Sequence, residues 1–208
     1  MANPRIQPVQ NNAEKRNTYS TMMAKCKKAI RLGYYFEAIM IDYAMIEDRL
    51  RSMIYHMGFL NSRKATKIWK KTRPALLQIV EQYKRENENT QLSVLKPDGK
   101  LKILRYVIKW AINTEDDYRD DKFLRTLKSQ LEGLDLAEFL DTLDKLESWK
   151  CLRNEVVHGM LNKNLAAITE AAAPPAIEGM QLGRAVDSQE RAFKRGNKVR
   201  KSVGLQNN

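Results

Sequence analysis

Residues 34–58, YYFEAIMIDYAMIEDRLRSMIYHMG, carry the pattern that decides the fold class of this chain. Apolar side chains return at every third or fourth position, which is the spacing of one face of an α-helix. Gly33 precedes the stretch and Gly58 closes it, and glycine is the residue that most often ends a helix. The pattern therefore predicts a helix over about 35–56.

The same spacing extends through most of the chain, whereas the alternating pattern of β-strands is nowhere sustained. Further helices are predicted at about 13–31, 102–112, 117–131 and 136–161. Residues 62–73 are also predicted to be helical, and Pro74 either kinks this helix or opens a new one over 75–85. Residues 86–90 and Pro97-Asp98-Gly99 predict a long loop. We therefore expect an all-α protein, a single up-and-down-type helical bundle of about five to six helices.

The composition also changes along the chain. Residues 1–14 are predicted to form a polar N-terminal extension, and residues 15–165 to form the helical domain. Residues 166–208 mix Ala, Pro, Gly, Gln, Lys and Arg with little periodicity. This composition predicts a basic, largely disordered tail with at most one fragile helix around 188–195.

Positive charge is the main clue to a partner. The 208 residues hold 37 Lys and Arg against 25 Asp and Glu, which gives a net charge of +12. The surplus lies in the two chain ends and in residues 61–73 and 96–112, whereas residues 113–147 are acidic. Such a surplus favours a polyanion, above all nucleic acid, whose backbone the basic blocks and the tail would hold.

Other classes of protein are excluded by composition. Two cysteines and two histidines are too few for a disulfide scaffold or a metal centre built on these residues, so we expect neither a metal nor another cofactor. No apolar run reaches the length of a membrane span, and residues 1–10 lack an apolar signal region. We therefore expect a cytoplasmic protein that does not bind a membrane.

One carboxylate interrupts the apolar face of the helix predicted at 35–56. At 100° per residue, Glu47 lies between Tyr43, Leu50 and Ile54. A carboxylate there needs a cation, a donor or an interface, because burying it alone is costly. The alternative, which stays open, is that the Glu47 side chain extends into solvent at the edge of the apolar face.

Two cations interrupt the apolar face of the helix predicted at 136–161. Arg153 falls near the centre of that face with Lys150 beside it, while Asn154 lies at its edge and His158 about 100° from its centre. Glu155 is predicted to face solvent. A planar guanidinium in this position suits a carboxylate or a phosphate. An ion pair between Arg153 and Glu47 that holds two helices together is the simplest structural explanation.

These residues belong to Trp149-Lys-Cys-Leu-Arg-Asn-Glu-Val-Val-His-Gly159, which resembles the signature of the HEPN superfamily. HEPN proteins are small helical domains found in many bacterial toxins, phage-defence proteins and RNA-processing enzymes. Their pattern is an Arg followed by a polar residue and, a few residues later, a His. Arg153, Asn154 and His158 match this pattern.

The resemblance implies an endoribonuclease that needs no metal and uses the ribose 2′-hydroxyl as its nucleophile. His158 would transfer protons, Arg153 would stabilise the charge of the phosphorane, and Asn154 would position the phosphate or the histidine. We add Lys150 as a phosphate contact and Glu47 as a supporting residue.

The resemblance also implies partners. HEPN nucleases dimerise and thereby bring two Arg–His pairs into one cleft, so we expect a homodimer. An antitoxin or a defence complex is a further expected partner. Some antitoxin-paired members carry a Tyr two residues after the His, where this chain has Met160, and regulation through that position is therefore in doubt.

Three alternatives remain open at this point. Arg51 and His56 have the same spacing as Arg153 and His158, and we interpret them as a chance match on a solvated helix face. The chain is also compatible with a catalytically inactive module of the same fold that binds RNA, a nucleotide or a protein. A third possibility is an unrelated helical adaptor or oligomerisation protein with basic tails.

Overall fold

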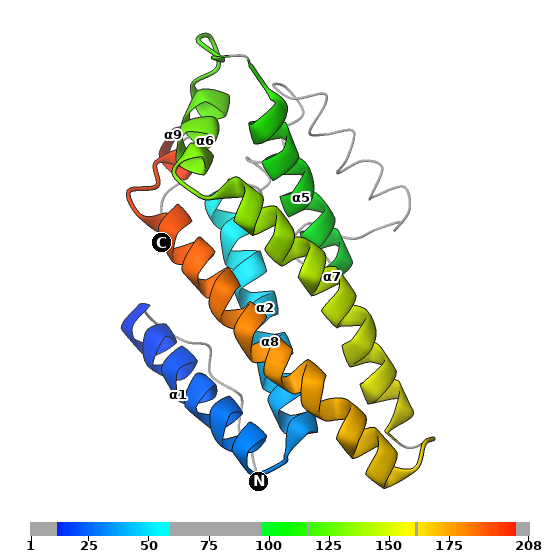
Figure 1. The fold of residues 1–208 in the computed structure, drawn as a ribbon. Helices are drawn as coiled ribbons and strands as arrows, with labels where there is room; N and C mark the ends of the chain where they lie inside the picture. Colours follow the sequence, from blue (N-terminus) through cyan, green and yellow to red (C-terminus); the bar gives the residue numbers. More distant parts are fainter. Residues whose placement is uncertain (1–11, 59–96, 116, 161, 203–208) are drawn as a thin grey trace, which may run out of the picture. The chain divides into compact units, whose positions relative to one another are not determined.

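A computed structural model describes residues 12–58, 97–115, 117–160 and 162–202 (Figure 1). Within these ranges the chain is helical and contains no strand, which confirms the all-α prediction. The helices are α1 (Asn12–Arg31), α2 (Tyr35–His56), α5 (Pro97–Asn113), α6 (Lys122–Glu132), α7 (Leu136–Gly159), α8 (Leu165–Lys194) and α9 (Val199–Ser202). The helices predicted at 62–73 and 75–85 lie outside the described residues.

The chain forms two compact units. Unit 1 contains Met1–Met45 and Leu152–Gln181, and unit 2 contains Ile46–Cys151 and Leu182–Asn208. Helices α2, α7 and α8 contribute one part to each unit. The motif residues Arg153, Asn154 and His158 therefore belong to unit 1.

The ends of α1 and α2 agree with the sequence prediction. Gly33 has φ +78° and Gly58 has φ +85°, a left-handed conformation that glycine adopts without strain. Because these two glycines end the helices, α2 covers the predicted residues Tyr35–His56.

Unit 1 packs α1 against the first half of α2. The fully buried Cys26 donates from Sγ to Asp42 Oδ1 at 3.1 Å, and Ala29, Ala38 and Ile39 are buried nearby in sequence. Asp42 is only 1% exposed, although at 100° per residue it lies outside the apolar face that contains Tyr43, Leu50 and Ile54. The two faces of α2 are therefore both used for packing, which its apolar pattern alone did not indicate.

Unit 2 holds the larger apolar core. Its fully buried side chains come from every helix of the unit and include Leu50, Met53, Ile54, Leu104, Ile108, Leu127, Leu131, Phe139, Leu143, Phe193 and Val199. Arg49 is 6% exposed and lies with its Nε 2.7 Å from Asp187 Oδ1, so α2 and α8 also share a buried ion pair.

The prediction of a largely disordered segment after residue 165 is wrong for α8, which runs for 30 residues. Asn164 caps this helix, because its Oδ1 accepts from the backbone N–H of Ala166 at 3.0 Å and of Ala167 at 3.3 Å. Small and apolar residues are buried along one face of this helix, at intervals of four, six or seven positions. They are Ile168, Ala172, Ala176, Leu182, Val186 and Phe193. This buried face stabilises the helix although Pro174 and Pro175 lie inside it.

Replacing Phe193 by alanine tests this assignment. We expect the free energy of unfolding to fall by about 3–5 kcal/mol, since the ring is fully buried and its removal leaves a cavity. Urea denaturation measures the change. Ile177→Ala is the matched control, because Ile177 lies on the same helix and is 43% exposed. A loss at Phe193 no larger than the loss at Ile177 would mean that α8 does not pack as described.

Two other helix starts also differ from the prediction. Pro97, expected in a loop, is the first residue of α5, where its fixed φ suits the first turn and its missing N–H costs nothing. Helix α6 begins at Lys122 rather than near 117, because Asp121 Oδ1 accepts from the N–H groups of Phe123 and Leu124, each at 3.0 Å. None of the described helices has an apolar run sufficient to cross a bilayer.

Candidate functional site

The motif lies in the last two turns of α7. Arg153 and Asn154 are half-buried, and His158 is exposed in the final turn. Gly159 lets the end of α7 approach the next helix, since a Cβ there would lie 3.0 Å from Ile168 Cδ1 of α8. The expectation that the motif sits in the last long helix is wrong, because α8 follows it.

Arg153 is held by an aromatic ring. Its guanidinium carbon lies 4.1 Å from the centroid of the Tyr43 ring, a cation–π contact between α7 and α2 within unit 1. Contacts of this kind contribute about 0.5–2 kcal/mol, and the contribution is larger where the contact is shielded from solvent. The stack fixes the plane of the guanidinium.

The charge of Arg153 has no carboxylate partner among the described residues. Its Nε is buried and donates to no acceptor in the same part of the chain. A guanidinium that is held in place but not neutralised is suited to an anion, because a phosphate can accept from its donors and balance its charge.

His158 and Asn154 lie together on another side of α7. His158 follows Asn154 by four positions, so the two residues lie about 40° apart in helical projection. His158 and Arg153 lie about 140° apart. Glu155 is exposed, as predicted, and accepts from Lys163 Nζ at 3.0 Å. Within one copy of the chain, the helix thus groups Asn154 with His158 and directs Arg153 elsewhere.

The two supporting residues lie in unit 2, each with its own partner. Lys150 Nζ donates to Glu147 Oε1 at 2.6 Å, one turn away on α7. Glu47 accepts at Oε1 from Lys100 Nζ at 2.5 Å, and the side chain of Lys100 is 4% exposed. The predicted need of Glu47 for a cation is therefore confirmed, but the cation is Lys100 of α5 rather than Arg153.

The second Arg–His pair has a different environment. Arg51 is exposed, and the His56 ring packs edge-on to Tyr55 with 5.1 Å between the ring centroids. The backbone oxygen of His56 also accepts from Asn197 Nδ2 at 3.5 Å. These neighbours give His56 a packing role in unit 2.

No family model, curated protein or solved structure matches this chain. The resemblance to HEPN proteins therefore rests on the motif and on the surroundings of its three residues.

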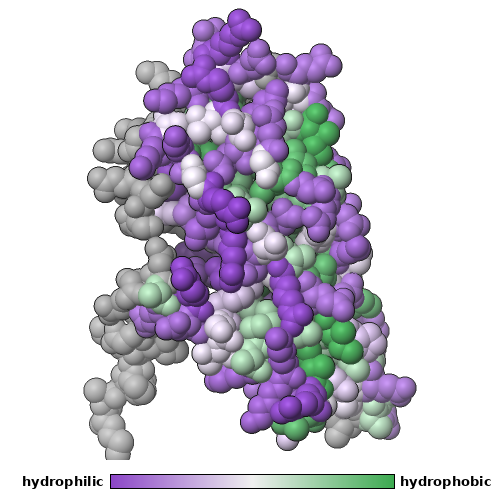
Figure 2. Space-filling model, turned by 60° about the vertical axis from the view of Figure 1, so that its left-hand side comes forward, coloured by the Kyte–Doolittle hydropathy of each residue, from purple (hydrophilic) through white to green (hydrophobic). Residues whose placement is uncertain are grey.

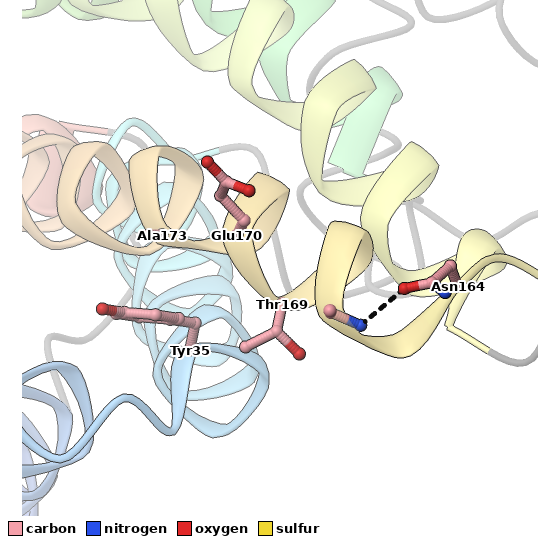
Figure 3. A pocket seen from close by; sticks show the side chains of 6 residues that line it. Tyr35, Asn164, Thr169, Glu170 and Ala173 are labelled. Atoms are coloured by element: carbon pink, nitrogen blue, oxygen red, sulfur yellow. Dashed lines mark hydrogen bonds between the residues drawn. The ribbon is translucent and has the colours of Figure 1, made fainter.

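Unit 1 also contains a groove. It has a volume of about 730 Å³ and is lined by Tyr35, Asn164, Ala166, Thr169, Glu170 and Ala173 (Figure 3). The groove lies between the start of α2 and the start of α8, and no motif residue lines it. In the described ranges, no three His, Cys, Asp or Glu side chains come close enough to hold a metal ion.

Proposed function

We propose that this protein is a metal-independent endoribonuclease of HEPN type, built on Arg153, Asn154 and His158. The observation that supports it best is the state of Arg153, which is held against Tyr43 and has no carboxylate partner among the described residues. A structural arginine of a helix interface is normally paired, because an unpaired charge in a partly buried place is costly. An arginine kept unpaired is suited to an anionic transition state.

The reaction needs no outside nucleophile. A neutral imidazole takes the proton of the ribose 2′-hydroxyl, O2′ attacks phosphorus, and the bond from phosphorus to O5′ breaks. O5′ leaves with a proton from a second acid, so that a 2′,3′-cyclic phosphate and a 5′-hydroxyl form. Arg153 stabilises the extra negative charge of the phosphorane, and Asn154 orients His158 or the phosphate.

A second copy of the chain supplies what one copy lacks. His158 and Arg153 diverge by about 140° on α7, and one imidazole cannot be both the base and the acid in a single step. A two-fold dimer would bring two Arg–His pairs into one cleft. Lys150, which is paired with Glu147, would support the site by contacting phosphates. Glu47 would support it through its ion pair with Lys100.

The biological setting follows from the same proposal. A nuclease of this kind acts on RNA in the cytoplasm, as a toxin or as a phage-defence effector. It then requires an antitoxin or a defence complex to restrain it.

The second candidate is an RNA-binding module of the same fold without catalysis. The divergence of Arg153 and His158 within one copy favours it, because an unassembled site could bind phosphate but not cut. In that case RNA is bound in a salt-dependent manner and remains intact.

Cleavage of RNA in EDTA distinguishes these functions. We expect cleavage by the wild type and none by the double variant Arg153→Ala/His158→Ala. The matched control is Arg51→Ala/His56→Ala, which removes an Arg–His pair of the same spacing and is expected to stay active. Equal cleavage by all three proteins would indicate a contaminating nuclease and would contradict the proposal, whereas binding without cleavage supports the second candidate.

A further inference from the structure

We propose that α1 is a binding surface for the RNA backbone, an inference that rests on the proposed function. Helix α1 carries six cations, Lys15, Arg16, Lys25, Lys27, Lys28 and Arg31, against the single acid Glu14. Four of them form what we call the α1 stripe, namely Arg16, Lys27, Lys28 and Arg31.

The α1 stripe faces away from the core of unit 1. On a helical projection its members span about 120°, while Cys26 and Ala29, both buried, lie on the other side. All four cations are exposed. Figure 2 turns toward the viewer the side of Figure 1 on which α1 lies, and hydrophilic residues make up much of the surface there.

The four cations of the stripe lack the ion pairs that several other described cations form. No carboxylate pairs with any of its four members in the described ranges. In contrast, Arg49, Lys100, Arg105, Lys128, Lys145, Lys150 and Lys194 each form an ion pair. The charge of the α1 stripe is therefore not neutralised by a carboxylate of the described chain and is available to a binding partner.

Length and neighbours favour a nucleic-acid strand. From Arg16 to Arg31 the helix rises by about 22 Å, which is enough for several phosphates of one strand. Tyr34 follows the stripe directly and is 59% exposed. An exposed aromatic ring beside a row of cations is the arrangement on which single-stranded bases stack.

The surroundings disfavour a membrane surface. A helix that lies on a membrane needs an apolar face beside its basic face. Within the arc of the stripe the other residues are small or polar, namely Ala13, Asn17, Ser20 and Ala24. The apolar side of α1 packs against α2 instead, where Cys26 binds Asp42.

The salt dependence of RNA binding tests the inference. Affinity for a single-stranded RNA is measured at several salt concentrations in a His158→Ala background, in which cleavage is expected to be slow. We expect Arg16→Gln/Lys27→Gln/Lys28→Gln/Arg31→Gln to lower the slope of log affinity against log salt by about 3, since each lost phosphate contact removes about 0.7. The smaller variant Lys27→Gln/Arg31→Gln is expected to remove about half of that.

The control removes the same charge from elsewhere. Lys122, Arg125, Lys128 and Lys145 lie in the acidic segment 113–147, and their replacement by Gln is expected to leave the slope close to that of the His158→Ala background. Equal loss of slope in both variants would show only a net-charge effect and would overturn the inference. Loss of binding to phosphatidylserine vesicles but not to RNA would overturn it in favour of a membrane.

The test also separates the two proposals. If the wild type cleaves RNA and the stripe variant keeps the full slope, the inference about α1 fails while the nuclease stands. If the wild type neither binds nor cleaves RNA, the proposed function is wrong, and the inference about α1, which rests on it, is wrong as well.

Discussion

Replacing His158 by alanine is expected to lower the rate of RNA cleavage by about 10²- to 10⁴-fold, the usual contribution of a positioned general acid or base. His158 is exposed on the last turn of α7, so the loss is chemical and not a loss of packing. The rate is measured in EDTA with saturating RNA, so that weaker binding does not enter.

Two controls accompany this variant. Its thermal unfolding and its affinity for RNA are expected to match those of the wild type, because the imidazole is exposed. His56→Ala removes the other histidine and is expected to retain the rate. A His158→Ala protein as fast as the wild type would exclude His158 from the chemistry.

Replacing Arg153 by alanine is expected to slow cleavage by about 10²- to 10³-fold, as the removal of one positioned donor does in other enzymes. Arg153→Lys keeps the charge but is expected to rescue little, because an ammonium does not offer a planar group that stacks on Tyr43 and donates from its edge. Arg51→Ala, which removes an exposed arginine of α2, is the control for loss of charge.

Tyr43 distinguishes a positioning role from a structural one. Tyr43→Phe keeps the ring face below the guanidinium and is expected to retain the rate. Tyr43→Leu removes the face and is expected to slow cleavage by about 3- to 30-fold at saturating RNA. If both variants lose stability and activity in parallel, Tyr43 serves packing alone.

The sequence predicted those helices whose ends have strong local signals. Gly33 and Gly58 end α1 and α2 at the expected places, because glycine adopts the left-handed conformation required there. Helix α8 was missed because its sequence is rich in alanine, glycine and proline, which together resemble a low-complexity segment. Asn164 was the overlooked start signal.

Tertiary partners were the least predictable feature of the site. A carboxylate within an apolar arc correctly indicated a cation for Glu47, but the cation comes from Lys100, in the first turn of a helix that was predicted to begin only at about residue 102. Tyr43 was visible only as one apolar residue among others, and its stack on Arg153 depends on how α2 and α7 pack. Spacing along one helix cannot identify such a partner on another.

The chemical ends of the RNA products test the central claim most directly. With the wild type in EDTA we expect a 2′,3′-cyclic phosphate on one fragment and a 5′-hydroxyl on the other, since the ribose hydroxyl is the nucleophile. We also expect a substrate that lacks the 2′-hydroxyl next to the scissile phosphate to stay uncut. Products with a 3′-hydroxyl and a 5′-phosphate, or cleavage of the 2′-deoxy substrate, would contradict the proposed role of Arg153 and His158.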